Sequence, residues 1–180
     1  MPGELMHIIE EDEAILNDIW SFYFHDPYDE KWTYDSYKKI CDITSVEEFW
    51  GVNNLVSDKI QHGMFFLMRE HVFPCWDDEN NKAGGCVSIK VLKNELVTFW
   101  EELCARVLGE TLLTEGNETM WNYVNGISVS PKKHFCIIKL WIKTPDLAKP
   151  SCFNIPTNYH GEVVYRSNQE SIDYDHLKRT

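Results

Sequence analysis

Short apolar runs separated by polar turns recur along the chain and predict β-strands. The runs are rich in β-branched and aromatic residues and are bounded by turn signals such as Asp26-Pro27. The polar segment 71–84 interrupts the series and is predicted to be a loop around Pro74. The predicted strands cover residues 19–24, 37–43, 64–69, 86–91, 124–130, 134–143 and 162–165.

Two further segments show the longer periodicity of a helix. The first begins with a capping box at residues 45–48, and its apolar residues recur near helical spacing at Val46, Phe49, Val56 and Ile60. The second is predicted to begin at an Asn94 cap and to end at Gly109. A single apolar stripe follows this second helix, formed by Leu96, Phe99, Leu103 and Val107.

The order of these elements predicts an α+β fold, in which a curved antiparallel sheet carries helices on one face and leaves the other face free for a ligand. No Pro-, Gly- or Ser-rich linker divides the chain, so residues 14–167 are expected to form one domain. The acidic residues 1–13 and the polar residues 168–180 are expected to be flexible ends.

Charge limits the ligands that such a face could bind. The chain carries 17 Lys and Arg against 29 Asp and Glu, a formal net charge of −12. This balance excludes a protein that coats nucleic acid by bulk attraction to phosphate, so an anionic ligand requires a local basic patch. Residues 131–143 supply such a patch, with no acidic residue and four lysines: Lys132, Lys133, Lys139 and Lys143.

Cysteine spacing and the N-terminus indicate the compartment. The six cysteines form no Cys-x-x-Cys pair and have no His-x3-His companion, so they are expected to be reduced thiols and not zinc ligands. The chain starts with neither a secretion signal nor Met-Gly, and no apolar stretch approaches the roughly 20 residues that span a bilayer. A cytoplasmic protein without membrane segment, metal or cofactor is therefore expected.

The loop at residues 74–85 has the most distinctive chemistry, because Trp76 is followed by the acidic run Asp77-Asp78-Glu79. A solvated acidic turn whose Trp folds back onto the core would explain this composition. Alternatively, the indole stacks on a flat cationic ligand while a carboxylate accepts its N–H donors. A third interpretation is a metal or general-base cluster of these carboxylates with His71, as in a metal- or carboxylate-dependent hydrolase, but no Ser or Cys nucleophile motif lies nearby.

Several motifs occur together at compatible spacing: this loop, residues 45–50 (Ser-Val-Glu-Glu-Phe-Trp), Phe99-Trp100 and residues 108–110 (Leu-Gly-Glu). Together they resemble the eukaryotic translation initiation factor 4E family, and Trp20, Trp32, Gly126 and Trp141 fall in step with it. The resemblance runs from about residue 16 to about residue 165. It implies a protein without enzymatic activity that binds the 7-methylguanosine cap of messenger RNA on the concave face of the sheet, with helices on the convex face.

The resemblance implies a role for each residue that meets the base. Trp32 and Trp76 are similar to the two indoles that sandwich the methylated guanine, which N7-methylation makes a delocalised cation. Asp77 stands where the family usually has Glu, and would accept the base N1–H and exocyclic N–H as a pair. Trp141 resembles the Trp that contacts the N7-methyl group, although a core Trp at the end of a long strand is the alternative.

For the phosphates, Lys132 matches the family's principal phosphate-binding Arg, and Lys133 and His134 are candidate contacts on the same turn. A lysine is a point charge and gives less directional contact than Arg. Two other basic positions of the family fall on Cys86 and Ile137, so the phosphate site is either thinned or rebuilt. Arg166 is a candidate replacement.

On the convex face the resemblance implies a docking surface at Val46 and Trp50. There the family receives an amphipathic helix with a Tyr-x4-Leu-hydrophobic motif, from a scaffold initiation factor of the 4G type or a 4E-binding repressor. Family leucines are replaced here by Glu101 and Ala105, and a carboxylate in an apolar groove is costly unless it is paired. A non-standard partner or another pose is therefore expected.

The segment between Trp141 and Tyr165 is shorter than is typical, and Pro150 and Pro156 interrupt what is normally a third helix. These departures suggest a divergent paralogue. They leave open a protein-interaction module or translational repressor of the same fold, with weak or no cap binding.

Overall fold

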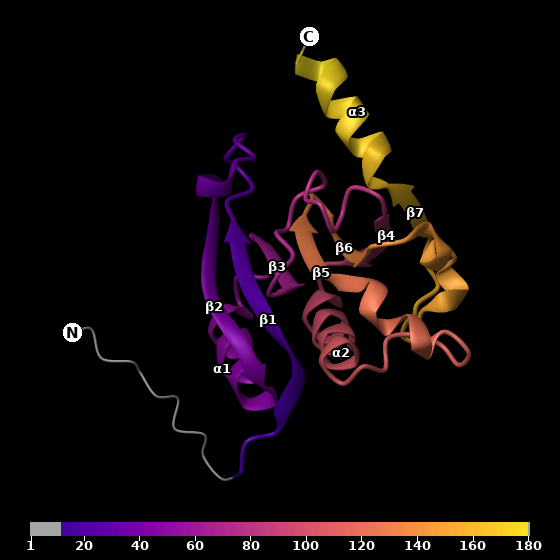
Figure 1. The fold of residues 1–180 in the computed structure, drawn as a ribbon. Helices are drawn as coiled ribbons and strands as arrows, with labels where there is room; N and C mark the ends of the chain where they lie inside the picture. Colours follow the sequence, from indigo (N-terminus) through magenta and orange to yellow (C-terminus); the bar gives the residue numbers. More distant parts are fainter. Residues whose placement is uncertain (1–11, 180) are drawn as a thin grey trace, which may run out of the picture.

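The computed structural model describes residues 12–179, which form a seven-stranded antiparallel sheet (Figure 1). The strands lie in the order β2-β1-β3-β5-β6-β4-β7, and every neighbouring pair is antiparallel. The predicted α+β class with a curved antiparallel sheet is confirmed. The strands are β1 (Ile15–His25), β2 (Tyr37–Ser45), β3 (Met64–Arg69), β4 (Gly85–Leu92), β5 (Val124–Pro131), β6 (Phe135–Ile142) and β7 (Val163–Ser167).

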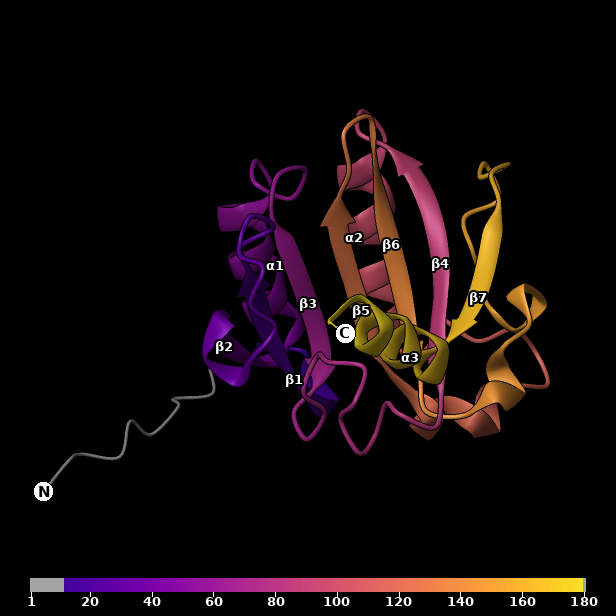
Figure 2. The same cartoon turned by 90° about the horizontal axis from the view of Figure 1, so that it is seen from above.

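Two helices, α1 (Val46–Val56) and α2 (Leu96–Leu108), pack on the convex face of the sheet, and Figure 2 shows α2 running behind β5 and β6. Alternate strand residues point toward the helices, as the period of two requires. Leu67, Val87 and Leu140 of the strands share one buried cluster with Phe49 of α1 and Leu103 of α2. Burial of this apolar surface holds the helices against the sheet.

α1 begins with a variant of the predicted capping box. The Glu48 N–H donates to Ser45 Oγ at 3.2 Å, as expected for an N-cap. The Glu48 carboxylate reaches one residue further back than the usual box, and accepts from the Thr44 N–H at 2.6 Å and from the Thr44 hydroxyl at 2.9 Å. The strand end and the helix start are therefore joined by three hydrogen bonds.

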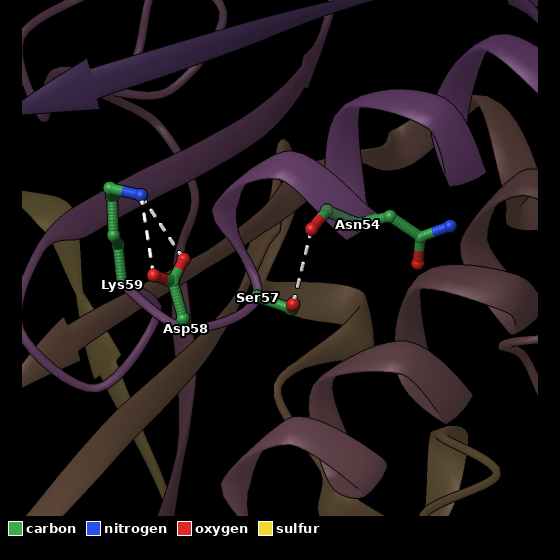
Figure 3. A network of polar contacts seen from close by, with 4 residues as sticks. All are labelled: Asn54, Ser57, Asp58 and Lys59. Carbon is green, nitrogen blue, oxygen red and sulfur yellow. Dashed lines mark hydrogen bonds and ion pairs between the residues drawn. The ribbon is translucent and has the colours of Figure 1, made fainter.

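The end of α1 comes at Val56, four residues before the predicted stripe ends at Ile60. The Ser57 hydroxyl donates to the Asn54 carbonyl at 3.3 Å, and Lys59 pairs with Asp58 at 3.1 Å (Figure 3). Ile60 is nonetheless fully buried, so its apolar character marks the core beneath the following turn.

α2 begins without the predicted Asn94 cap, which was wrong. Asn94 is exposed, and the N-cap position belongs to Glu95, whose side chain makes no capping bond. A backbone turn takes the place of the cap, because the Glu95 N–H donates to the Leu92 carbonyl at 3.1 Å. Gly109 ends the helix as predicted, with its N–H bonded to the Ala105 carbonyl at 2.9 Å.

The segment expected to be a flexible polar tail instead forms α3 (Asn168–Arg179), which extends beyond the end of the sheet (Figure 1). Ser167 and Glu170 form a reciprocal capping box, each N–H donating to the other side chain at 3.2 Å. Asn168 is buried, and its Nδ2 donates to the Asn81 carbonyl at 2.7 Å. The Ser-x-x-Glu spacing was the signal for this helix. The acidic segment 1–13 lies almost entirely outside the described residues.

Between β6 and β7 the chain forms short 3-10 turns, at Pro145–Leu147 and Pro150–Cys152, in agreement with the prediction that proline interrupts a helix here. Asn154 secures the segment, since its Nδ2 donates to the carbonyls of Thr111 and Leu113, both at 2.9 Å. In the part of the chain that the structure describes, no helix has the length and apolar character needed to cross a membrane.

A buried arginine joins the start of β1 to β3 and β5. Arg69 donates from Nε to the Val124 carbonyl at 2.6 Å and from one terminal nitrogen to the Trp121 carbonyl at 3.0 Å. Its other terminal nitrogen pairs with Asp18 at 2.7 Å, and its guanidinium lies 5.0 Å from the centroid of the Trp20 ring. Each of the three guanidinium nitrogens therefore has an acceptor.

Candidate functional site

The concave face of the sheet is built from cross-strand rows of residues that point away from the helices. We call these rows the concave floor. One row runs through Met68, Gly126, Trp141, Cys86 and Arg166. The adjacent row runs through Phe66, Ser128, Lys139, Ser88 and Val164.

Trp141 lies within the floor and is only 3% exposed. Its indole N–H donates to Ser128 Oγ at 2.9 Å, and its ring lies 6.4 Å from that of Phe66. It belongs to a buried cluster on the concave side and not to the core beneath the helices. Because the N–H is already bonded, Trp141 can offer a ligand ring surface only.

The loop that carries Trp76 is held by one buried amide. Asn81 is fully buried, and its Nδ2 donates to the carbonyls of Phe73 and Cys75, both at 2.9 Å. Its Oδ1 accepts from Asn125 Nδ2 at 2.8 Å. The amide thus bridges both sides of the loop and ties it to β5, which leaves Trp76 half-buried above the floor.

In the acidic run on this loop, Asp77 and Glu79 are exposed and Asp78 is half-buried. Asp78 accepts the Asn80 N–H at 2.9 Å, and Glu79 pairs with Lys82 at 2.8 Å. Burial, and then a hydrogen bond with Asp77, raise the pKa of the Cys75 thiol to about 12. Within residues 12–179, no three His, Cys, Asp or Glu side chains gather as a metal site. The arrangement therefore leaves the Asp77 carboxylate as the acceptor for a ligand.

Trp32 is 45% exposed and lies flat on the buried His25 ring, with centroids 4.0 Å apart and planes at 3°. His25 Nε2 is within hydrogen-bond distance of the Lys31 carbonyl, at 2.9 Å. His25 therefore covers one face of the indole and leaves the other face open.

Aromatic side chains join the two tryptophan-bearing loops. The Phe73 ring lies 4.4 Å from the ring of Tyr34 and 4.8 Å from that of Tyr37. Tyr37 also meets the Trp32 ring edge to face at 6.1 Å. Burial, together with the charges of Cys75 and Asp77, raises the pKa of Tyr37.

Three cations converge on the floor. The Lys139 ammonium is half-buried and lies 5.6 Å from the centroid of the Trp76 ring. Burial lowers the pKa of Lys139, and the nearby positive charges of Lys132 and Arg166 lower it further. Lys132 and Arg166 are exposed, as are Lys133 and His134 in the turn after β5. No ion pair within residues 12–179 involves Lys132, Lys139 or Arg166.

The surface predicted to receive a partner lies between α1 and α2. Phe49 is fully buried while Trp50 is half-buried beside it, with their rings 5.2 Å apart. Glu101 is half-buried and accepts from Asn53 Nδ2 at 2.8 Å, and Asn53 Oδ1 in turn accepts the Trp100 N–H at 3.1 Å. The carboxylate is therefore paired. Val46 is half-buried and Ala105 is exposed.

The sequence pattern of the family described as eukaryotic initiation factor 4E matches residues 15–180. The chain belongs to this family. Translation initiation factor 4E of Candida albicans is 31% identical over 145 residues, which cover 74% of this chain and 66% of that protein. The factor 4E of Dictyostelium discoideum is 33% identical over 119 residues, covering 64% and 45%. The matched regions thus span about half to two thirds of these relatives.

Solved structures of initiation factor 4E proteins share the fold. Ascaris suum eIF4E-3, solved with an m2,2,7G cap, superimposes with a TM-score of 0.64 at 25% identity, covering 73% of this chain and 74% of that one. Caenorhabditis elegans eIF4E-3, solved with the 4E-binding protein Mextli and a cap analogue, gives a TM-score of 0.74 at 20% identity, covering 89% and 96%. As a member of a family of translation initiation factors, this factor 4E protein is not an enzyme.

Two residues that shape the site of this chain, Lys139 and His25, were not predicted from the sequence. Lys139 belongs to the predicted basic patch for an anionic ligand, but the sequence predicted no individual contact for it. Its position two residues before Trp141 on a predicted strand placed both on one face, and that signal could have found it. His25 had no such signal, because its contact with Trp32 depends on how the loop after β1 turns back.

Proposed function

We propose that this chain is a cytoplasmic protein that binds the 7-methylguanosine cap of messenger RNA on its concave face. The observation that carries the proposal is the position of Trp76, whose ring already faces the Lys139 cation 5.6 Å away, above a floor that contains the rings of Phe66 and Trp141. Family membership and the cap complexes of related proteins agree with it. The matched structures also share the curved sheet that forms the floor.

In this proposal Trp76 and the open face of Trp32 enclose the methylated base. A cation gains about 1 to 2 kcal/mol on each indole face once water is excluded. Unmethylated guanine lacks the positive charge and loses most of this attraction. Asp77 accepts the two base N–H groups, a charge-assisted pair of about 3 kcal/mol, and Trp141 offers its ring to the N7-methyl group.

The test is calorimetric titration with 7-methyl-GTP, with GTP as the reference ligand. The wild type should bind the methylated nucleotide at least about tenfold more tightly, since one cation–π face is worth about 1 to 2 kcal/mol. Trp76→Leu should reduce this preference by about tenfold, because one of the two indole faces is lost. Trp50→Leu is the matched control, because it deletes a half-buried indole on the convex face and should leave the preference intact. Equal affinity of the wild type for both nucleotides would refute cap binding.

The convex surface is proposed to dock a helical partner of the scaffold or 4E-binding repressor class. Structures of related proteins contain such partners, Mextli in one case and 4E-BP in another. The half-buried Trp50 and Val46 provide an apolar contact, while the Asn53-bonded Glu101 places a carboxylate on the convex surface. Trp50→Leu should abolish binding of a Tyr-x4-Leu-hydrophobic peptide. If the wild type binds this peptide tightly and Glu101→Leu leaves the affinity unchanged, Glu101 does not determine which partner binds.

A second candidate function is an interaction module of the same fold that has lost cap binding. The substitution of Cys86 and Ile137 at basic positions of the family favours it. This function predicts a folded wild type that binds neither nucleotide and still binds the peptide, and the titrations above discriminate the two.

A further inference from the structure

The position of Lys139 on the concave floor disfavours its charged form. It stands on β6 between Ser88 and Ser128, with its ammonium against the Trp76 ring. Two further cations, Lys132 and Arg166, are near enough to disfavour its charge, in addition to the effect of burial. Like charges held together at a half-buried position destabilise one another unless an anion neutralises them.

Cations also lie beside Cys86 and Ile137, the two positions at which this chain lacks a basic residue of the family. Cys86 is the direct cross-strand neighbour of Arg166 on β7. Ile137 is the cross-strand neighbour of Lys90 on β4. Side chains that are directly opposite in an antiparallel pair lie about 4.5 to 5.5 Å apart at Cβ. A charge moved to the neighbouring strand can therefore reach nearly the same space.

We propose that Lys139, together with Lys132 and Arg166, binds the phosphate chain of the capped nucleotide. This rests on the proposed cap-binding function and adds to it a residue from the middle of the floor. In the free protein the Lys139 ammonium lies on Trp76, and its flexible four-carbon stem lets it turn toward a phosphate without leaving the floor. The phosphate site is in this sense rebuilt and not thinned.

The test compares Lys139→Met and Lys139→Arg with the wild type by calorimetry, using 7-methyl-GTP, 7-methylguanosine and inorganic tripolyphosphate. Lys139→Met should weaken 7-methyl-GTP binding about ten- to a hundredfold, as the loss of a charged hydrogen bond requires. Lys139→Arg should restore affinity to within about threefold, because the charge is kept. The control is Lys59→Met, which removes the same charge from an exposed position in the turn after α1 and should leave all three affinities unchanged.

The nucleoside separates phosphate binding from a role in supporting Trp76. If Lys139 binds phosphate, Lys139→Met keeps or improves its affinity for 7-methylguanosine, which has no phosphate. An equal loss of affinity for 7-methylguanosine and 7-methyl-GTP would show that Lys139 only positions the Trp76 ring, and would overturn the proposal. So would a Lys139→Met protein with wild-type affinity for 7-methyl-GTP.

Tripolyphosphate keeps the test independent of cap recognition. If the wild type does not prefer the methylated base, the proposed function fails, but the anion site can still be judged. Tripolyphosphate binding that Lys139→Met loses and Lys139→Arg retains supports the site. Equal tripolyphosphate affinity in all three proteins overturns it.

Discussion

Asn81→Asp should destabilise the protein and weaken ligand binding, because Asn81 holds the loop that carries Trp76. The change keeps the shape of the side chain and removes both N–H donors that bridge the Phe73 and Cys75 carbonyls. It also sets a carboxylate against these two carbonyl oxygens in a fully buried position. Each carbonyl keeps one backbone donor, the Cys75 N–H to Phe73 at 2.8 Å and the Asp78 N–H to Cys75 at 3.4 Å. The cost is therefore that of two lost hydrogen bonds and of a buried carboxylate facing two carbonyl oxygens, about 3 kcal/mol together. For a domain of this size that lowers Tm by about 6 to 12 °C.

The assay pairs thermal unfolding with 7-methyl-GTP titration. Asn154→Asp is the matched control, since Asn154 Nδ2 also donates to two carbonyls at 2.9 Å but lies between β6 and β7. Both variants should lose stability, whereas only Asn81→Asp should lose affinity, by about tenfold or more if roughly 1.4 kcal/mol of positioning is lost. A fall in Tm below about 2 °C for Asn81→Asp, or equal losses of affinity in the two variants, would refute the reasoning.

Three other predictions concern different parts of the fold. Arg69→Lys should lower the free energy of unfolding in urea by about 2 to 3 kcal/mol, because one ammonium cannot serve two carbonyls and Asp18 together; an unchanged midpoint would contradict this. Gly126→Ala should prevent stable folding or lower Tm by more than about 5 °C, because φ is +158° and a Cβ would lie 2.4 Å from the Leu67 carbonyl oxygen; circular dichroism melting would show it. Burial raises the pKa of Cys75 from 9.0 to about 12, so the folded state holds the thiol proton more tightly than the unfolded state does. The resulting contribution to the free energy of unfolding is complete below pH 9 and is lost as pH rises toward 12. Urea unfolding of wild type and Cys75→Ser across that window should therefore show a smaller decline in the variant, and parallel declines would refute it.

Local pattern in the sequence determined most of the elements. β3 has the predicted bounds, residues 64–69, and the other strands were found with ends displaced by a few residues. Apolar alternation and capping spacing report which residues face a core, and this information lies within a few neighbouring positions. The same spacing marked the box at Ser45 and was overlooked at Ser167, where α3 begins. The tryptophan loops were located by a family resemblance carried by contiguous motifs.

Tertiary structure alone decided which of these residues meet. Lys139 contacts Trp76, which lies 63 positions earlier in the chain, and Glu101 accepts a hydrogen bond from Asn53, 48 positions earlier. Such contacts depend on strand register and helix placement, which no local period encodes. The sequence by itself therefore determined the strands, the two helices of the convex face and the candidate residues, whereas the contacts of Lys139 and Glu101 were set by packing between distant segments.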